Sequence, residues 1–362
     1  MQKNKRFRRV FLHVGLGKTG TSTIQSYLAT NAVRIERDYD IHFPHVFDLA
    51  GPFDGNHSQL LRTISRSEVE HSSTHTYFAG TKVNGMALGA EEVRSKFDSG
   101  FSDSKATQLL ISAEAVGHFN ARQLLLLSSW LCEYSESVVV IACIRHPVAA
   151  LSSEIQQRLR FGAVLEELYE KPPCYSFREL LPRLEAAFPG SEMLLYDFED
   201  ASGSSSGVVG TFLQKIGIEE DLRGDFSGRV NPSMSQHGAM LLSALNQARS
   251  SGSAACVDEG LTRGDVAPFL KIPGRKFQAV PRAYGRLERL VEKDLLWLEQ
   301  EHGVNLTCRP IDTHAQGFIF SERWLARLAV GISACHVAFR RFRALGRLFS
   351  EKVSLRPLSS KK

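Results

Sequence analysis

With 362 residues, the chain exceeds the size at which one small hydrophobic core suffices, which favours a single large α/β domain with insertions. Hydrophobic residues make up 43% of the sequence, charged residues make up 23%, and the mean hydropathy is -0.16, which excludes a disordered, fibrous or membrane-embedded protein. The net charge of +5 is uneven, because residues 319–362 hold ten Lys and Arg against two Asp and Glu. A basic tail of this kind can approach acidic glycans or an anionic membrane, and it does not by itself predict a nucleic-acid-binding protein.

The N-terminus and the cysteines predict a cytoplasmic protein. The basic segment Met1–Arg9 runs directly into Val10–Gly15, which is too short and too rich in glycine for the apolar part of a signal peptide. The longest apolar stretch, 324–339, is interrupted by Arg327 and His336, so no membrane anchor is expected. The six cysteines form no Cys-x-x-Cys pair and no cluster with histidine, which favours free thiols and no metal site. We expect a cytoplasmic protein whose basic tail allows peripheral contact with the inner membrane face.

The first residues of the chain are expected to form a strand, a glycine turn and a helix, in that order. Residues 9–15 are a short apolar run typical of a buried strand, and residues 21–35 place Ile24 and Leu28 on one side of a helix. Residues 40–105 are rich in glycine, proline and histidine, and we expect a loop-rich insertion over one end of the sheet. Loops in such positions often bind substrates.

Apolar strands alternate with helices along the middle of the chain. We expect strands at 109–112, 138–144 and 193–196, and helices at 121–132, 147–161 and 208–216. Near-continuous apolar strands separated by helices indicate a parallel sheet with helices on both faces. The sequence therefore predicts a three-layer α/β fold.

The later part of the chain is expected to be helical. Residues 233–250 and 281–302 have amphipathic spacing. The second of these helices is expected to turn five side chains inward: Leu287, Leu290, Val291, Leu295 and Leu298. Residues 251–280 are a candidate lid, because they are rich in Gly, Pro and charge. The expected organisation is one domain over 1–317, with its ligand-binding core at about 9–217, followed by a basic helical tail over 318–362.

A glycine-rich loop joins the first strand to the first helix and predicts an anion site. Its sequence, from Gly15 to Ser22, is Gly-Leu-Gly-Lys-Thr-Gly-Thr-Ser. Backbone N–H groups and the helix dipole favour an anion at such a junction, and glycine lets the backbone approach phosphate oxygens closely. Lys18 adds a mobile cation. The alternative is a tight turn with an incidental lysine. The loop does not match the nucleoside-triphosphatase pattern G-x-x-x-x-G-K-S/T, which requires glycine at position 12 and finds Leu12.

The segment His13–Ser22 resembles the 5′-phosphosulfate loop of the sulfotransferase family, in which Lys-x-Gly-Thr followed by Thr or Ser opens the first helix. The resemblance implies a P-loop-type fold, the donor 3′-phosphoadenosine 5′-phosphosulfate (PAPS) and no metal. It also implies that the donor contacts six loop residues: Gly17, Lys18, Thr19, Gly20, Thr21 and Ser22.

A second segment is similar to the same family. The strand at 138–144 is followed by Arg145-His-Pro, and Ser153 stands eight residues after Arg145 on the next expected helix. A guanidinium at a strand end and a hydroxyl on the following helix can converge on one phosphate monoester. The alternative is an Arg-x-Pro turn with serines as helix caps. The resemblance implies that Arg145 and Ser153 bind the 3′-phosphate of PAPS.

The resemblance covers residues 9–36 and 109–160, and extends less closely to about 217. Members of the family often carry a further basic element for the 3′-phosphate. Arg229 and the pair Arg275–Lys276 are both candidates for it, and neither aligns securely.

Sulfuryl transfer needs stabilisation of the charge on the departing phosphate and a base for the proton of the acceptor. Lys18 can supply the first. In the family, the base is a His or Glu just beyond the strand that here occupies 109–112, which points to Glu114, although Glu114 can equally be a helix-start residue favoured by the dipole. His57, in the loop before it, is the rival base or an acceptor contact.

Two other functions compete with this hypothesis. A P-loop kinase is supported by Lys18-Thr19 and by Asp197 at a strand end, where kinases of this type hold Mg²⁺. A non-catalytic protein that retains the fold could use the basic tail to bind a membrane or glycan. The similarity to bacterial members implies an acceptor hydroxyl or amine on a carbohydrate or lipid-linked sugar.

Overall fold

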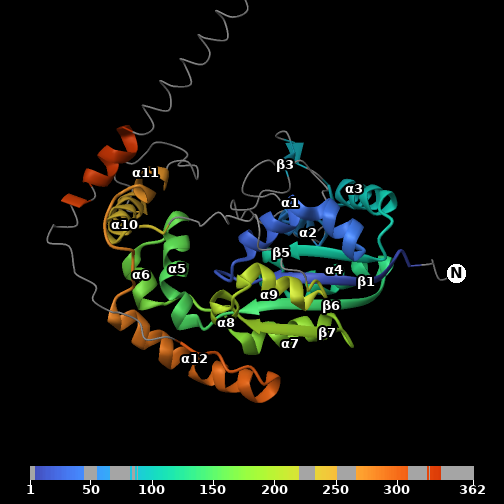
Figure 1. Cartoon of the computed structure of the whole chain (residues 1–362). Coiled ribbons are helices and arrows are strands. Elements are labelled where there is room, and N and C mark those ends of the chain that lie inside the picture. The colour runs from blue at the N-terminus through green and yellow to red at the C-terminus, as the bar shows by residue number, and fades with distance from the viewer. Residues whose placement is uncertain are drawn as a thin grey trace, which may run out of the picture. The chain divides into compact units, whose positions relative to one another are not determined.

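The computed structural model describes residues 5–44, 55–65, 82–83, 86–87, 89–219, 233–250, 266–308, 324–325 and 327–335 (Figure 1). The chain divides into two compact units. The first unit comprises residues 1–147, 175–230 and 290–309, and the second comprises residues 148–174, 231–289 and 310–362. No helix among the described residues is both long enough and apolar enough to cross a membrane.

The first unit contains a five-stranded parallel sheet with the strand order β2-β5-β1-β6-β7. Its strands are β1 (Phe7–Gly15), β2 (Ile41–His42), β5 (Gln108–Ala113), β6 (Ser135–Ile144) and β7 (Glu192–Asp197). Two short strands, β3 (Lys82–Val83) and β4 (Met86–Ala87), form a separate antiparallel pair. Since all five strands of the main sheet are parallel, their carboxyl ends share one edge, which is the edge where such folds bind ligands.

Helices cover both faces of this sheet and make three layers (Figure 1). One face carries α2 (Ser58–Ile64), α3 (Ala90–Asp103), α4 (Ala121–Tyr134) and α7 (Phe177–Ala187). The other face carries α1 (Thr21–Tyr39), α8 (Phe198–Gly203) and α9 (Gly207–Lys215). The three-layer α/β fold that the sequence predicts is confirmed.

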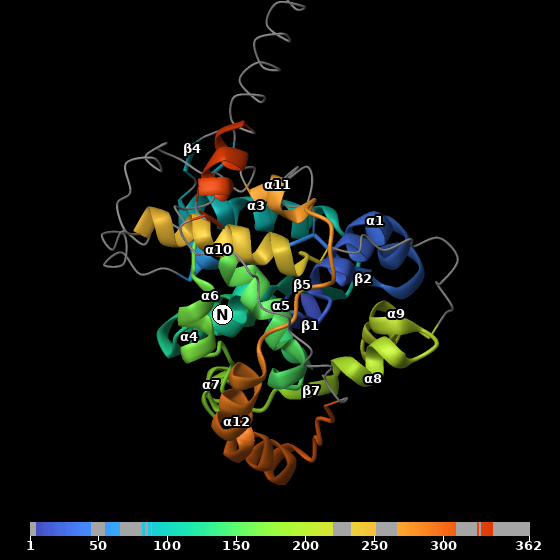
Figure 2. The same cartoon turned by 90° about the vertical axis from the view of Figure 1, so that its left-hand side faces the viewer.

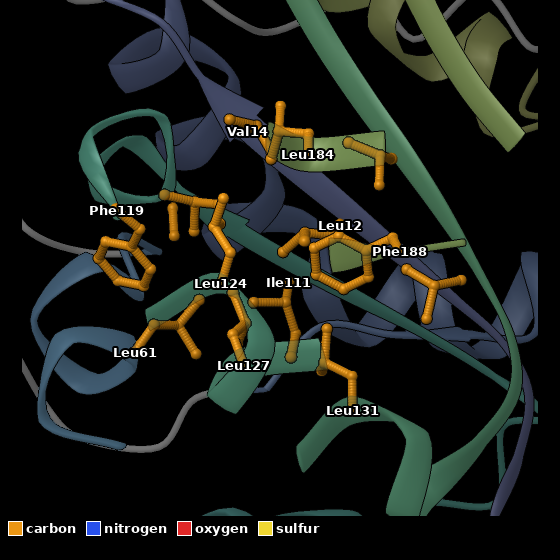
Figure 3. Packing of buried hydrophobic residues seen from close by; sticks show 14 of the residues in the cluster. Leu12, Val14, Leu61, Ile111, Phe119, Leu124, Leu127, Leu131, Leu184 and Phe188 are labelled. Carbon is orange, nitrogen blue, oxygen red and sulfur yellow. The ribbon is translucent and has the colours of Figure 1, made fainter. Parts of the chain in front are cut away.

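The strands alternate between the two faces, because successive side chains of a strand point in opposite directions. Leu12 and Val14 of β1 pack with the α2, α4 and α7 side chains shown in Figure 3, whereas Phe11 packs with α1 and α9. Figure 3 also shows Ile111 of β5 close to Leu127 of α4. Burying one such side chain stabilises the folded chain by about 1.5–3 kcal/mol. The two cores together therefore hold the strands, and with them the carboxyl edge of the sheet, in place.

The stretch 40–105, expected to be rich in loops, contains two helices that were not predicted. Helices α2 and α3 bury Leu61, Phe97 and Phe101 in the same core as β1 and β5. The signal was present, because Val93, Phe97 and Phe101 recur every four residues, the spacing of one helix face. The abundant glycine and proline around this pattern concealed it.

A buried carboxylate joins two of the helical segments of the first unit. Asp294 of α12 (Pro281–His302) accepts hydrogen bonds from the backbone N–H groups of Phe177, at 2.7 Å, and Arg178, at 3.0 Å, and from the hydroxyl of Ser176, at 3.1 Å. These N–H groups start α7 and have no partner inside their own helix. Asp294 therefore caps α7 from a distant part of the chain.

The regular elements described in the second unit are helices. It contains α5 (Pro147–Arg160) from its second residue onward, α6 (Leu165–Glu170), α10 (Gln236–Ser250), α11 (Ala267–Leu270) and the first part of α12. Helix α11 lies beside α10 in both views (Figures 1 and 2), and the close approach needs a glycine, because a Cβ at Gly238 would lie 2.3 Å from the carbonyl oxygen of Phe269. Residue Leu290 of α12 was expected to point inward and is 61% exposed instead.

Candidate functional site

The strand order defines one position where the direction of the chain reverses. After β1 the chain passes to the β2 and β5 side of the sheet, whereas the strand that follows β6 in the sheet, β7, lies on the opposite side. The segments that leave β1 and β6 therefore diverge, and ligands of open α/β sheets bind at such points. The end of β1 lies against β6, since Gly15 pairs with Cys143. Residues 16–20 and Arg145 consequently lie at this switch point.

The loop after β1 has a backbone shape that requires its glycines. Lys18 and Gly20 adopt left-handed conformations, with φ of 63° and 76°. A side chain at Gly15 would place its Cβ 2.4 Å from the Cγ2 atom of Thr21, closer than real contacts allow. A non-glycine residue in the left-handed region costs free energy, and such residues concentrate at ligand sites. The loop is therefore a tightly folded turn whose backbone conformation depends on its glycines.

The start of α1 is an uncapped helix N-terminus. Gly20 occupies the N-cap position and makes no side-chain cap, and the first turn of α1 contains no acidic residue. Helices α2, α3 and α9 also start without a side-chain cap, whereas Asn120 and Gln123 form a capping box at α4 and Asp197 caps α8. The first N–H groups of a helix lack intrahelical partners, and its dipole places partial positive charge there. The helix of 19 residues that follows the glycine loop is therefore suited to an anion.

The hydroxyl groups of the loop divide into two kinds. Thr19 donates to the carbonyl oxygen of Leu16 at 2.7 Å, and its hydroxyl lies 3.3 Å from that of Thr21. Both threonines are buried, so their hydroxyls brace the loop. Ser22 is exposed, and Lys18 is partly buried. The structure thus brings together the six loop residues that the sequence indicates, Gly17 to Ser22, with Ser22 facing solvent.

Arg145, at the end of β6, reaches the loop. Its Nη1 atom donates to the carbonyl oxygen of Lys18 at 3.2 Å. Its Nε and Nη2 atoms both contact the Oε1 atom of Glu199, at 2.9 and 2.8 Å. The guanidinium also lies over the ring of Phe198, 4.5 Å from the ring centre. Sequence reasoning found Arg145 and missed Phe198 and Glu199, because nothing in their local sequence indicates a partner 54 residues away.

Asp197, the residue on which the kinase alternative depends, has a structural role. Its carboxylate accepts the backbone N–H of Glu199 and caps α8, and it is 8% exposed. Burial raises the pKa of Asp197, and the nearby carboxylates of Asp200 and Glu199 raise it further. A group in this position is poorly placed to act as the ligand of a hydrated metal ion.

Glu114 lies at the same edge of the sheet. It is the first residue of a short 3-10 helix, η3 (Glu114–His118), directly after β5, and its side chain is partly exposed. Gly117, in the same turn, lies against the loop after β1, because a Cβ at that position would stand 2.8 Å from a methyl group of Leu16. The turn that carries Glu114 therefore packs directly on the loop that carries Lys18.

His57 is buried, and both of its ring nitrogens are committed to the backbone. The Nδ1 atom accepts the N–H of Ser112 at 3.1 Å, and the Nε2 atom lies 2.9 Å from the carbonyl oxygen of Pro44, to which it must donate. The ring is consequently neutral, and its one lone pair is already used by the N–H of Ser112, so it is not available to take a proton from a substrate. The geometry does not support His57 as a base. It assigns His57 to holding the end of β5, two residues before Glu114.

A second buried histidine stiffens the same region. The Nδ1 atom of His13 lies 2.8 Å from the hydroxyl of Ser112, which also accepts a hydrogen bond from Gln25 at 3.1 Å. The ring packs on Phe212 with 4.6 Å between ring centres. Complete burial lowers the pKa of His13 to about 3, so the ring is neutral at physiological pH. This cluster links β1, β5 and α1 beneath the loop, and sequence reasoning did not find it.

The remaining predicted residues belong to the second unit or lie outside the described residues. Ser153 is on α5 in the second unit, so its convergence with Arg145 stays a prediction. Its neighbour Ser152 accepts the N–H of Ala279 at 2.9 Å and contacts the hydroxyl of Tyr284 at 2.7 Å, which indicates a structural role. Arg275 and Lys276 are exposed, and Lys276 pairs with Ser235.

Three predicted features fall wholly or partly on residues that the structure does not describe. They are Arg229, the first half of the candidate lid at 251–265, and the basic tail over 318–362 except for residues 324–325 and 327–335.

Within the described ranges, no group of three or more His, Cys, Asp or Glu side chains is arranged to hold a metal ion. Comparisons of the chain with protein-family models, curated proteins and solved structures found no match. The candidate site therefore has to be interpreted from its own geometry and chemistry.

Proposed function

We propose that this chain is a sulfotransferase that takes the sulfuryl group from PAPS and transfers it to a hydroxyl or amine of a carbohydrate or lipid-linked acceptor. The observation that carries the proposal is the pairing of an uncapped, glycine-shaped helix N-terminus with a strand-end arginine that reaches the same loop. The first element suits the 5′-phosphosulfate, and the second suits a further phosphate on the same nucleotide.

The residues present fit this donor in two respects. The first turn of α1 carries no acidic side chain that would repel a phosphosulfate, and Lys18 lies in that loop. Arg145 stands at the neighbouring strand end and carries a planar guanidinium, which suits a phosphate monoester. PAPS supplies an activated sulfuryl group when it is bound. The chain has to bind and orient it, neutralise the charge that grows on its 5′-phosphate, and take the proton of the acceptor.

Each residue of the site then has a defined task. Lys18 neutralises the negative charge that grows on the 5′-phosphate as the bond between that phosphate and sulfur breaks. The N–H groups at the start of α1 hold the same phosphate. Glu114 takes the proton of the acceptor hydroxyl as the new bond to sulfur forms. The His57 and Ser112 hydrogen bonds fix the strand end before Glu114, which keeps the carboxylate at the edge of the sheet.

Two observations disfavour the alternatives. The loop lacks the first glycine of the triphosphatase pattern, and Asp197 is buried as a helix cap, which leaves Lys18-Thr19 as the remaining support of the kinase hypothesis. The non-catalytic hypothesis depends on the basic tail, which lies mostly outside the described residues, and it gives the uncapped start of α1 no ligand.

A nucleotide panel tests the proposal. Isothermal titration of adenosine 3′,5′-bisphosphate, AMP and ATP-Mg²⁺ should show preference for the bisphosphate over both controls. Arg145→Ala should abolish this preference, because the 3′-phosphate then loses its charged partner, while affinity for AMP changes little. A preference for ATP-Mg²⁺ would support the kinase, and no binding of any nucleotide would support the non-catalytic protein.

A further inference from the structure

Glu199 occupies the place at Arg145 where an anionic ligand would bind. Two nitrogens of the guanidinium contact one oxygen of Glu199, and the two side chains are only 17% and 16% exposed. A charge-assisted contact of this kind, partly shielded from water, is stronger than an exposed ion pair. In this structure, Arg145 therefore already has a counter-ion.

A phosphate cannot join this pair without a penalty. A phosphate dianion on Arg145 would stand beside the carboxylate of Glu199, and Asp197 and Asp200 add two further carboxyl groups at the start of α8. Like charges within a few ångströms repel strongly in a partly buried site. Either the phosphate stays away, or Glu199 leaves.

Arg145 also has two contacts that do not involve Glu199. Its guanidinium also lies over the ring of Phe198 at 4.5 Å and donates to the carbonyl oxygen of Lys18 at 3.2 Å. These two contacts involve no charged partner and would remain after Glu199 moved. Glu199 itself sits in the first turn of α8, where the helix dipole stabilises a carboxylate even without an arginine. Each partner therefore keeps a stabilising contact when the pair separates.

We propose that Glu199 is a resident anion that determines specificity at the donor site: it neutralises Arg145 in the free protein and is exchanged for the 3′-phosphate when the nucleotide binds. The inference rests on the proposed function. It implies that the wild type binds phosphate at Arg145 less tightly than its arginine allows. A nucleotide without a 3′-phosphate does not displace Glu199, so its affinity is independent of this residue.

The test compares two neighbouring carboxylates. Glu199→Gln removes the charge and keeps the shape, and Asp200→Asn makes the same change one residue along α8, at an exposed position. By calorimetry, Glu199→Gln should bind adenosine 3′,5′-bisphosphate at least about fivefold more tightly than the wild type, because a competing charge is gone. Its affinity for AMP, and the affinities of Asp200→Asn for both nucleotides, should stay within about twofold.

A second comparison, in the Arg145→Ala protein, distinguishes the replacement of Glu199 by the 3′-phosphate from a general effect of removing one negative charge. In Arg145→Ala, adding Glu199→Gln should no longer improve binding of the bisphosphate, because there is no arginine to release. If the wild type binds the bisphosphate and Glu199→Gln binds it equally or more weakly, Glu199 is a clamp that orients Arg145, and the exchange is wrong.

Failure of the proposed function gives a different result. If no variant binds either nucleotide, the donor assignment is wrong. Whether a phosphate replaces Glu199 at Arg145 is then tested with inorganic phosphate alone. Phosphate should then raise the melting temperature of Glu199→Gln more than that of the wild type and of Asp200→Asn. Equal increases in all three proteins would overturn the exchange.

Discussion

Replacing Gly20 by alanine should destabilise the chain and weaken nucleotide binding at the proposed donor site. Gly20 has φ of 76°, and an alanine in the left-handed region costs about 1–2 kcal/mol. Its Cβ would also lie 2.9 Å from the Cγ1 atom of Val208, and relieving this overlap adds about 1 kcal/mol. We therefore expect the free energy of unfolding to fall by about 2–3 kcal/mol, which lowers the melting temperature of a chain of this length by roughly 3 °C.

The measurement is thermal and denaturant unfolding, followed by titration with adenosine 3′,5′-bisphosphate. Gly89→Ala is the control, because its backbone is extended and, among the described residues beyond its chain neighbours, no heavy atom lies within 4 Å of the added Cβ. Adding Val208→Ala to Gly20→Ala should remove the overlap. The free energy of unfolding of the double variant should therefore fall by about 1 kcal/mol less than the sum of the two single changes. A Gly20→Ala protein as stable as the wild type, with unchanged nucleotide affinity, would refute the view that this loop is conformationally specialised.

Two further predictions concern titratable side chains at the edge and base of the site. Glu114→Gln should lower sulfuryl transfer at least about tenfold while nucleotide affinity is retained, because the amide cannot accept the proton of the acceptor; unchanged turnover would remove Glu114 from this role. The pKa of His13 is about 3 in the folded chain against 6.5 as the ordinary value, so the unfolded chain binds more protons below pH 6.5 and stability is lost as the pH falls. His13→Asn should therefore show a shallower decline of unfolding free energy below pH 6.5, by up to about 1.4 kcal/mol per pH unit, and equal slopes would contradict a buried neutral ring.

The parts of the fold that sequence reasoning predicted are those with strong local patterns. Strands β1 and β6 are continuous apolar runs, which identify buried parallel strands. The glycine loop lies between an apolar strand and an amphipathic helix, so its position at the sheet edge follows from chain order. Helix α3 escaped prediction because Gly100 and the surrounding glycines resemble a loop, although its phenylalanines have helical spacing.

The parts of the site that were missed depend on contacts between distant segments. The pairing of Arg145 with Glu199 exists only because β7 lies beside β6, which neither local sequence encodes. In the sequence, His57 is a candidate base because it lies in a loop. In the structure, its Nδ1 atom accepts the backbone N–H of Ser112, which the sequence around His57 does not indicate. Local sequence can indicate which residue types are present at a site, but only the tertiary contacts show which of their atoms are already used.

The most direct test of the central claim is a crystal structure of the chain with adenosine 3′,5′-bisphosphate. The account predicts the 5′-phosphate at the N–H groups that open α1, with Lys18 beside it. It predicts the 3′-phosphate within hydrogen-bonding distance of Arg145 and Ser153, with Glu199 withdrawn from the arginine. A nucleotide bound away from residues 15–22, or bound there with Arg145 still paired to Glu199 and no contact to the 3′-phosphate, would contradict it.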